Sequence, residues 1–411
     1  MELNNMKIQS IKVEQNGNSI NLSNTMPQIL LILLAFCEKN IVRYLILAVS
    51  IIPVIGVISN FILPVAYILL ILLSVNKKTK IYLLELLIPL FVLVSIMITC
   101  LIYPENKEYI FDPNNFWNTI FPCLRWFIVG LIIIPSKKIM NLLGFFSCLA
   151  ILVESIYLIF YMIPKNLIIS DDMSRAYQLL PNILLAFNYA FNNKKLIIWI
   201  ISFIGFVYIM SLGTRGPFLI LIFYILLKTL KTSAKSFKNN VLLTLIIGCL
   251  CIVFLVPDIR INLLKKISVL FKNVGLSTRI IDYLLNETVI SYTSGRNNLY
   301  DIAIEKIIEN PIFGYGIYGE WKWFGWNVHN MYLEIILHFG VILGTILLLW
   351  GILTVVQTYI KSNNYYVKDL IFIFSCFVFL RGFFGGSYLM FGVFFLLGLC
   401  VKEKNRIIKT L

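Results

Sequence analysis

Residues 330–357 read NMYLEIILHFGVILGTILLLWGILTVVQ, an apolar run in which Glu334 is the only charged side chain. A helix needs about 20 mostly apolar residues to cross the ~30 Å hydrocarbon core of a bilayer. Similar runs fill the chain, because its 411 residues are 59% hydrophobic and only 13% charged, with a mean hydropathy of +0.88. Average soluble domains carry roughly a quarter charged residues, so this composition excludes a water-soluble enzyme.

The apolar runs are continuous stretches of Leu, Ile and Phe without the alternation of β-barrel strands, and such runs form helices in lipid. We therefore expect an all-α, polytopic helical membrane protein with about twelve transmembrane helices. Their expected ranges are 41–57, 61–75, 81–103, 119–135, 140–163, 177–191, 195–211, 216–230, 241–256, 330–357, 369–383 and 385–401. Residues 26–37 are too few to span the bilayer and are expected to form an interfacial helix.

The distribution of positive charge predicts the orientation. A net charge of +15 in a soluble protein would suggest a nucleic-acid partner, but membrane proteins accumulate Lys and Arg in their cytoplasmic loops. With both termini in the cytoplasm, the inner segments hold 21 Lys and Arg, and the short outer loops hold 5. The expected regions are a cytoplasmic N-terminus (1–40), nine spans (41–256), a large extracytoplasmic loop (257–329), three spans (330–401) and a cytoplasmic tail (402–411).

The loop 257–329 is the only long connection, and a connection of that length usually carries function. Residues 297–309 have apolar side chains at helical spacing and stop at Asn310-Pro311, which predicts an amphipathic helix that lies at the membrane surface or caps a cavity. Three tryptophans follow. Clustered tryptophans mark membrane interfaces and also stack on sugar rings, so we consider all three as substrate-binding candidates: Trp321, Trp323 and Trp326.

Only two histidines are present. His329 lies where the long loop meets the tenth span, and a histidine at such a junction can titrate near neutral pH and act as a base. The alternative for His329 is an interfacial residue whose ring lies among the lipid headgroups. His338 lies deeper in the same span and is expected to be structural.

Arginines supply the other candidate groups on the outer face. Arg215 lies in a turn rich in Gly and Pro, Arg296 opens the predicted loop helix, and Arg175 lies in a further outer loop. The guanidinium fork suits phosphate or pyrophosphate oxygens and keeps its charge, so these residues predict an activated, membrane-held substrate such as a polyprenyl-diphosphate-linked glycan. The acidic pair Asp171-Asp172 lacks the spacing of a metal-dependent glycosyltransferase motif, so no metal and no cofactor are expected.

These residues belong to a longer pattern. It consists of Arg296, Tyr300, Ala303, Asn310, Pro311, Gly314, Gly316, His329 and Asn330, with Gly340 and Gly344 beyond and the turn Thr214-Arg215-Gly216 upstream. The pattern resembles the O-antigen ligase / Wzy-type polysaccharide polymerase family, over segments of the chain near 205–232 and 290–345. The family often has Ser where Thr214 stands.

The resemblance implies a metal-independent, inverting glycosyltransferase of the GT-C type, in which Arg215 and Arg296 hold the donor diphosphate and His329 is the base. Arg175 and Asn330 are candidates for additional substrate contacts. We expect a polymerase that joins undecaprenyl-diphosphate-linked repeats into a capsule, exopolysaccharide or O-antigen on the outer face of the bacterial cytoplasmic membrane. Expected partners are the lipid-linked donor and acceptor, membrane lipids, a flippase and a chain-length regulator, but no nucleic acid.

Two alternatives remain at this point. The same residues serve a ligase that moves finished glycan onto an acceptor, and they do not separate ligase from polymerase. A polysaccharide flippase also has about twelve spans, but its charged residues lie within the spans around a central cavity. The charges of interest here lie at the outer surface, which favours the enzyme.

Overall fold

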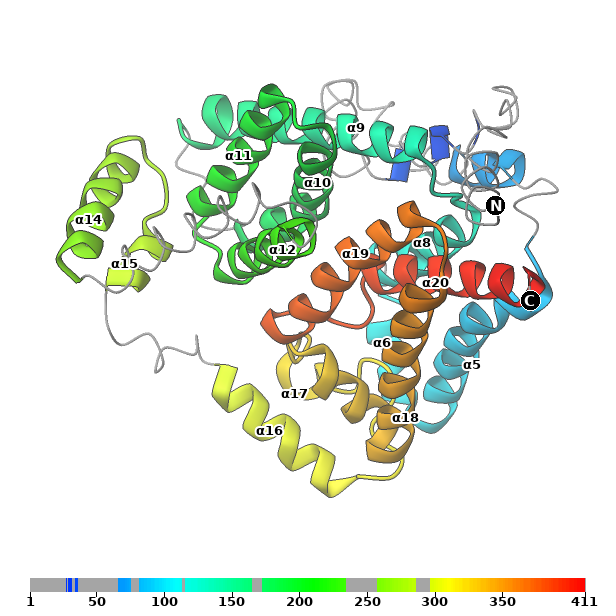
Figure 1. Cartoon of the computed structure of the whole chain (residues 1–411). Coiled ribbons are helices and arrows are strands. Elements are labelled where there is room, and N and C mark those ends of the chain that lie inside the picture. The colour runs from blue at the N-terminus through cyan, green and yellow to red at the C-terminus, as the bar shows by residue number, and fades with distance from the viewer. Residues whose placement is uncertain are drawn as a thin grey trace, which may run out of the picture.

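The structure is a computed structural model that describes residues 27, 29–31, 34–35, 66–74, 81–112, 115–164, 172–233, 257–285 and 296–410. These residues form helices joined by turns (Figure 1). The helices are α5 (Leu87–Ile102), α6 (Lys107–Ile110), α8 (Phe121–Ile132), α9 (Lys137–Tyr157), α10 (Asp172–Asn193), α11 (Leu196–Ser211), α12 (Arg215–Ser233), α14 (Pro257–Asn273), α15 (Arg279–Leu285), α16 (Arg296–Glu309), α17 (Trp321–Phe324), α18 (Met331–Lys361), α19 (Tyr365–Phe384) and α20 (Phe391–Thr410). Short 3-10 turns lie at Leu83–Leu86 and Pro104–Asn106, and π-helical turns at Phe116–Ile120 and Leu158–Met162.

The helical and apolar character agrees with a membrane protein. By length and composition, the stretches Lys137–Met162 and Met331–Lys361 could each cross a membrane, and α5, α8 and α11 are shorter apolar helices. Along α5, Leu90, Met97 and Leu101 are 54%, 64% and 77% exposed. The count of twelve spans stays a prediction, since 41–57 and 241–256 lie outside the described residues.

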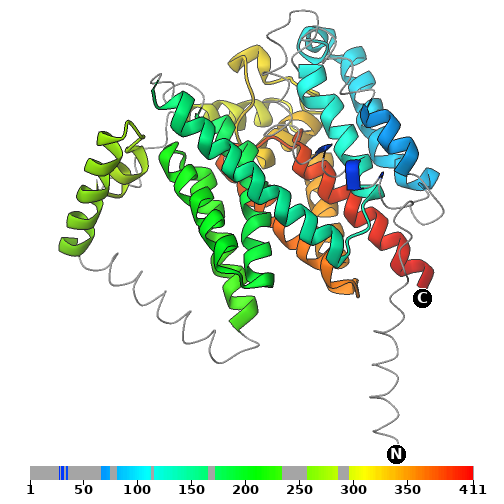
Figure 2. The same ribbon diagram turned by 90° about the horizontal axis from the view of Figure 1, so that it is seen from above.

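Helix α10 lies at the centre of a group that also contains α9, α11, α12 and α19 (Figures 1 and 2). Its side chains Leu180, Ile183 and Leu184 are completely buried. A second close pairing joins α8 to α20, where a Cβ at Gly130 or Gly398 would overlap backbone atoms of the other helix. Small residues allow such close approach between helices in membranes.

The helix predicted over 297–309 is confirmed as α16, which packs beside α18. Ala303 is fully buried, in a small cluster with Phe324, Val328 and Leu337. Ile308, also expected on the apolar face, is 71% exposed. Only the part of the predicted face near Ala303 is therefore used for packing within the chain.

The tenth span, predicted as one uninterrupted helix, is broken at Gly340, where φ is +76° and ψ is 169°. The preceding loop inserts its backbone into the break. Three hydrogen bonds join them: Tyr315 N–H to the Leu337 carbonyl at 2.9 Å, Gly316 N–H to the His338 carbonyl at 3.0 Å, and Val341 N–H to the Pro311 carbonyl at 2.7 Å. Because a broken helix leaves carbonyls without intrahelical partners, the loop is what makes the break stable.

Gly340→Ala is expected to destabilise the folded protein by at least ~2 kcal/mol, because positive φ alone costs a non-glycine residue ~1–2 kcal/mol and a Cβ would also overlap the Ile312 carbonyl oxygen. Thermal unfolding of the detergent-purified protein measures the effect. The matched control is Gly351→Ala in the same helix, where a Cβ meets nothing within 4 Å. Equal melting temperatures for the two variants would contradict the described break.

Candidate functional site

Arg215 is the first residue of α12 and follows a tight turn in which Gly213 has φ of +69°. A Cβ at Gly213 would overlap the Ser277 hydroxyl, and the Ser277 N–H donates a 3.1 Å hydrogen bond to the last carbonyl of α11. A Cβ at Gly216 would overlap the hydroxyl of Tyr177 on α10. The two glycines therefore let the start of α12 fit between the segment after α14 and helix α10.

The end of α19 lies beside the same turn. The Tyr177 hydroxyl donates to the Phe384 carbonyl at 3.1 Å, and the Arg381 guanidinium carbon lies 4.5 Å from the Tyr177 ring centroid. Arg175, in the first turn of α10, lies 5.0 Å from the ring centroid of Tyr157. The ends of α10, α12 and α19 thus carry three arginines at one end of the helix group. Arg175 and Arg215 are candidates for substrate contacts from the sequence, whereas Arg381 was placed on the outer face without a proposed role.

His329 is half-buried and has a left-handed backbone conformation, with φ of +59°. The Tyr300 hydroxyl of α16 donates to the His329 carbonyl at 3.4 Å. Asn330 caps α18, because its side-chain oxygen accepts hydrogen bonds from the N–H groups of Tyr332 and Leu333 at 3.0 and 3.2 Å. The Asn330 side-chain oxygen therefore already accepts two hydrogen bonds within the protein. Backbone strain held in place from both sides is typical of functional sites.

The start of α18 packs on the end of α19. The Tyr332 hydroxyl donates to the Phe379 carbonyl at 2.9 Å, and its ring lies 4.3 Å from that of Phe383. A Cβ at Gly382 would press on Met331. Since the end of α19 also contacts α10 near the start of α12, His329 and Arg215 lie at the same end of the helix group.

Arg296 is the first residue of α16, and its backbone lies at this end as well. Tyr300 contacts His329 at the start of α18, whereas Gly314, just after α16, lies against the break at Gly340. Helix α16 therefore runs beside the first half of α18 in the same direction. The side chain of Arg296 lies outside what the structure describes.

All three predicted site residues thus stand at helix N-termini. Arg215 begins α12, Arg296 begins α16, and His329 lies two residues before α18 begins. The N-terminus of a helix carries partial positive charge and free N–H groups, which makes it an anion-binding position. Arginines at such positions add full charges to the same field. Chemically, this arrangement favours the binding of a group with two or more negative charges, such as a diphosphate.

The three tryptophans divide into packed and exposed residues. Trp321 packs edge-on against Tyr318, with ring centroids 5.5 Å apart, and donates to the Asn327 side chain at 3.2 Å. Burial raises the pKa of Tyr318, so its phenol stays protonated at neutral pH. Trp323 packs edge-on against Tyr315 at 4.8 Å. Trp326 is 54% exposed, whereas Trp321 and Trp323 are half-buried.

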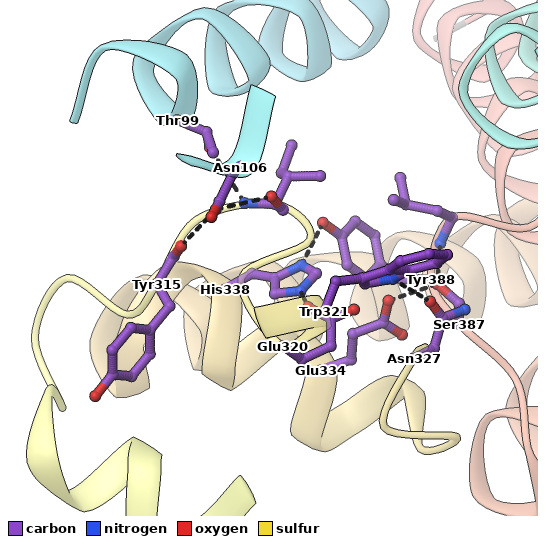
Figure 3. A network of polar contacts seen from close by, with 12 residues as sticks. Thr99, Asn106, Tyr315, Glu320, Trp321, Asn327, Glu334, His338, Ser387 and Tyr388 are labelled. Atoms are coloured by element: carbon purple, nitrogen blue, oxygen red, sulfur yellow. Dashed lines mark hydrogen bonds and ion pairs between the residues drawn. The ribbon is translucent and has the colours of Figure 1, made fainter. Parts of the chain in front are cut away.

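The structure also contains a buried polar cluster that the sequence did not predict (Figure 3). His338, expected to be structural, contacts the carboxylate of Glu320 through Nε2 and the hydroxyl of Tyr388 through Nδ1, the latter at 2.9 Å. Glu334 lies beside them and accepts a 2.7 Å hydrogen bond from Ser387. Glu334 and His338 are four residues apart and therefore lie on one helix face, and this spacing could have been recognised in the sequence. Glu320 joins them only because the loop folds back to the helix break.

An apolar cavity of about 150 Å³ lies next to this region, between α5, α18 and α20. Its lining includes Tyr332, just after the cap of α18, and Tyr388, which also contacts His338. The remaining lining residues are almost all aliphatic or aromatic.

The structure does not place the side chains of the acidic pair Asp171-Asp172, because Asp171 and the side chain of Asp172 lie outside the described residues.

Together, the fold and the site define a protein whose described residues form apolar helices, with arginine-bearing helix ends and a histidine at the same end of the helix group. Comparison with known proteins adds the family: the O-antigen ligase family model matches residues 200–349, the region that contains Arg215, Arg296 and His329. This match over residues 200–349 confirms the resemblance found in the motifs of the chain. No curated protein and no solved structure matches the chain.

Members of this family are glycosyltransferase-like enzymes of ligase or polymerase type, and their substrates are lipid-linked glycans. The match supports an activity of this general kind for the chain and agrees with its membrane character. It does not distinguish polymerisation from ligation.

Proposed function

We propose that this protein polymerises polyprenyl-diphosphate-linked oligosaccharide repeats into a surface polysaccharide on the outer face of the bacterial cytoplasmic membrane. The observation that carries the proposal is the position of Arg215, Arg296 and His329 at three helix N-termini within the region that matches the family. A diphosphate leaving group needs positive charge, and an acceptor hydroxyl needs a base. Both requirements are met by residues at one end of the helix group.

In the proposed reaction, His329 removes the proton from an acceptor sugar hydroxyl as its oxygen attacks the anomeric carbon of the donor. The bond from that carbon to the diphosphate oxygen breaks, and the electron pair leaves with polyprenyl diphosphate. Arg215 and Arg296 hold the diphosphate by charge-assisted hydrogen bonds, assisted by the helix N-termini. Attack opposite to the leaving group inverts the anomeric configuration. The arginines neutralise the diphosphate, so the reaction requires no metal ion there.

The apolar cavity between α5, α18 and α20 supports a lipid-linked donor. Tyr332 lines it and stands three residues after His329, so a short segment of a polyprenyl chain in the cavity would lie next to the proposed base. Exposed Trp326 is the candidate for stacking on a sugar of donor or acceptor. Arg175 and Arg381 would extend the positive surface toward the rest of the diphosphate-linked glycan.

A ligase is the second candidate, because the matching family model is that of the O-antigen ligase. The deciding experiment incubates the purified protein with a lipid-diphosphate-linked repeat as the sole glycan. A polymerase makes a ladder of longer lipid-linked products, whereas a ligase makes none until its acceptor is added. Absence of any transfer with either acceptor would contradict the proposal. A flippase and a chain-length regulator are the proposed partners in cells.

The orientation proposed here follows from the asymmetry of 21 against 5 positive residues. It places the segment 257–329 outside the cytoplasm and both termini inside. Reporter fusions at Asn273 and Lys235 should report opposite sides of the membrane. A cytoplasmic signal from Asn273 would remove the basis for a reaction on the outer face.

A further inference from the structure

The buried cluster of Glu320, Glu334 and His338 takes no part in the proposed transfer reaction. Each residue is at most 1% exposed, and one ligating atom from each lies within 4.8 Å of the others. Among the described residues, Oε1 of Glu320 and Oε2 of Glu334 have no hydrogen-bond partner. Buried carboxylate oxygens without partners are costly, so two of them in one buried cluster with an imidazole call for a cation.

We propose that Glu320, Glu334 and His338 bind one divalent first-row transition-metal ion, with Zn²⁺ and Mn²⁺ as the fitting species. A divalent ion balances the charge of the two carboxylates with the imidazole neutral. Imidazole nitrogen with carboxylate oxygens is a ligand set of Zn²⁺ and Mn²⁺, whereas Ca²⁺ and Mg²⁺ prefer oxygen ligands alone. Three protein ligands leave one position for water.

The surroundings of the cluster also resemble a metal site. A histidine that binds a metal through one ring nitrogen usually makes a hydrogen bond through the other, and ligating carboxylates are hydrogen-bonded in turn. Here the second nitrogen of His338 contacts the Tyr388 hydroxyl at 2.9 Å, and Ser387 donates to Oε1 of Glu334 at 2.7 Å. Ser387 and Tyr388 both belong to the turn between α19 and α20. This turn therefore holds the side chains of Glu334 and His338 in place.

The ion would tie three separate segments together. Glu320 belongs to the loop before α17, Glu334 and His338 belong to α18 before its break, and Ser387 and Tyr388 follow α19. The loop is fixed on its far side too, since the Asn106 amide donates to the carbonyls of Tyr315 and Ile317 at 3.0 and 3.1 Å. The ion therefore has a positioning role: it stabilises the half-helix that begins at His329, and it does not bind the diphosphate.

Metal analysis of the full-length protein, purified without chelator, tests the site. Wild type should hold about one Zn²⁺ or Mn²⁺ per chain, as expected for a buried site with three protein ligands. Glu320→Gln and Glu334→Gln should each lower that content at least tenfold. Glu154→Gln is the matched control, because Glu154 is another buried glutamate, hydrogen-bonded to Tyr208 instead. A metal-free wild type, or full metal content in Glu320→Gln, would overturn the proposal.

A second measurement covers variants that fail to fold. Wild-type protein stripped with a chelator should melt at a lower temperature and recover on addition of Zn²⁺ or Mn²⁺. His338→Cys should still respond to Zn²⁺ and lose its response to Mn²⁺, because thiolate suits zinc. Ser387→Ala should weaken Zn²⁺ affinity about 10- to 100-fold. No change of melting temperature with either ion would mean that the carboxylates share a proton instead. These readouts are independent of polymer formation, so they can fail while the proposed function stands.

Discussion

Arg215→Ala and Arg296→Ala are each expected to reduce transfer from a lipid-diphosphate-linked donor by about 10²–10³-fold, the usual effect of removing one preorganised donor to a developing negative charge. Lysine should not rescue either position, because it keeps the charge but loses the planar fork that binds two phosphate oxygens. We expect Arg→Lys to leave at most about a tenth of the activity, since a bidentate pair becomes a single contact. The measurement is the initial rate of product formation by purified protein.

The control for these arginines is Arg406→Ala in α20. Arg406 lies 3.5 Å from Glu403 in the C-terminal part of the chain, on the side predicted to be cytoplasmic. It should leave the rate unchanged. If Arg296→Ala supports normal polymer in cells, the donor assignment is wrong. If only Arg215 matters, Arg381 becomes the second residue to test, because its guanidinium stacks on the tyrosine that contacts the start of α12.

The sequence predicted well those features that depend on local pattern. The amphipathic helix was found at 297–309 and observed at Arg296–Glu309, because its apolar spacing and the Asn310-Pro311 stop are encoded within a few residues. The candidate site residues Arg215, Arg296 and His329 came from the spacing of a motif, and their roles stay a prediction. The structure adds a contact between two residues of this motif, because the Tyr300 hydroxyl donates to the His329 carbonyl.

The break in α18 could not be predicted in the same way. Hydropathy treats Gly340 as one neutral position in an apolar run, and glycine is common in transmembrane helices. Its left-handed conformation depends on backbone donors from residues 315 and 316, which lie more than twenty residues upstream. For the same reason the pairing of Glu320 with His338 was missed. Non-local backbone contacts determine both features, and neither leaves a periodic signal.

The break at Gly340, the buried cluster and the strained His329 all lie in or next to one short stretch of helix. Residues 331–339 carry a cap at Asn330 on one side and the break at Gly340 on the other. The cluster fixes this half-helix to the loop and to the turn after α19. From the sequence, His338 was expected to be structural and His338→Ala to be far milder than His329→Ala. Given the cluster, we expect it to lower stability and metal content, so it is unsuitable as a neutral control for His329.

His329→Asn is expected to reduce transfer by about 10²–10⁴-fold, the usual contribution of a general base. Asparagine is the informative replacement, because it tolerates the left-handed conformation at this position and cannot accept the proton. His329→Ala should be at least as inactive and also less stable. In cells the variant should accumulate lipid-linked single repeats while donor binding by the purified protein stays intact.

Lys194→Ala separates the cost of backbone strain from the loss of the base. Lys194 also has positive φ, at +57°, but lies in the turn between α10 and α11, far along α10 from Arg175. It should lose stability to a similar degree as His329→Ala and keep full activity per folded molecule. If His329→Asn elongates the lipid-linked glycan as fast as wild type, His329 is not the base. The strained backbone would then serve only to start α18, and the proton acceptor would have to be sought elsewhere.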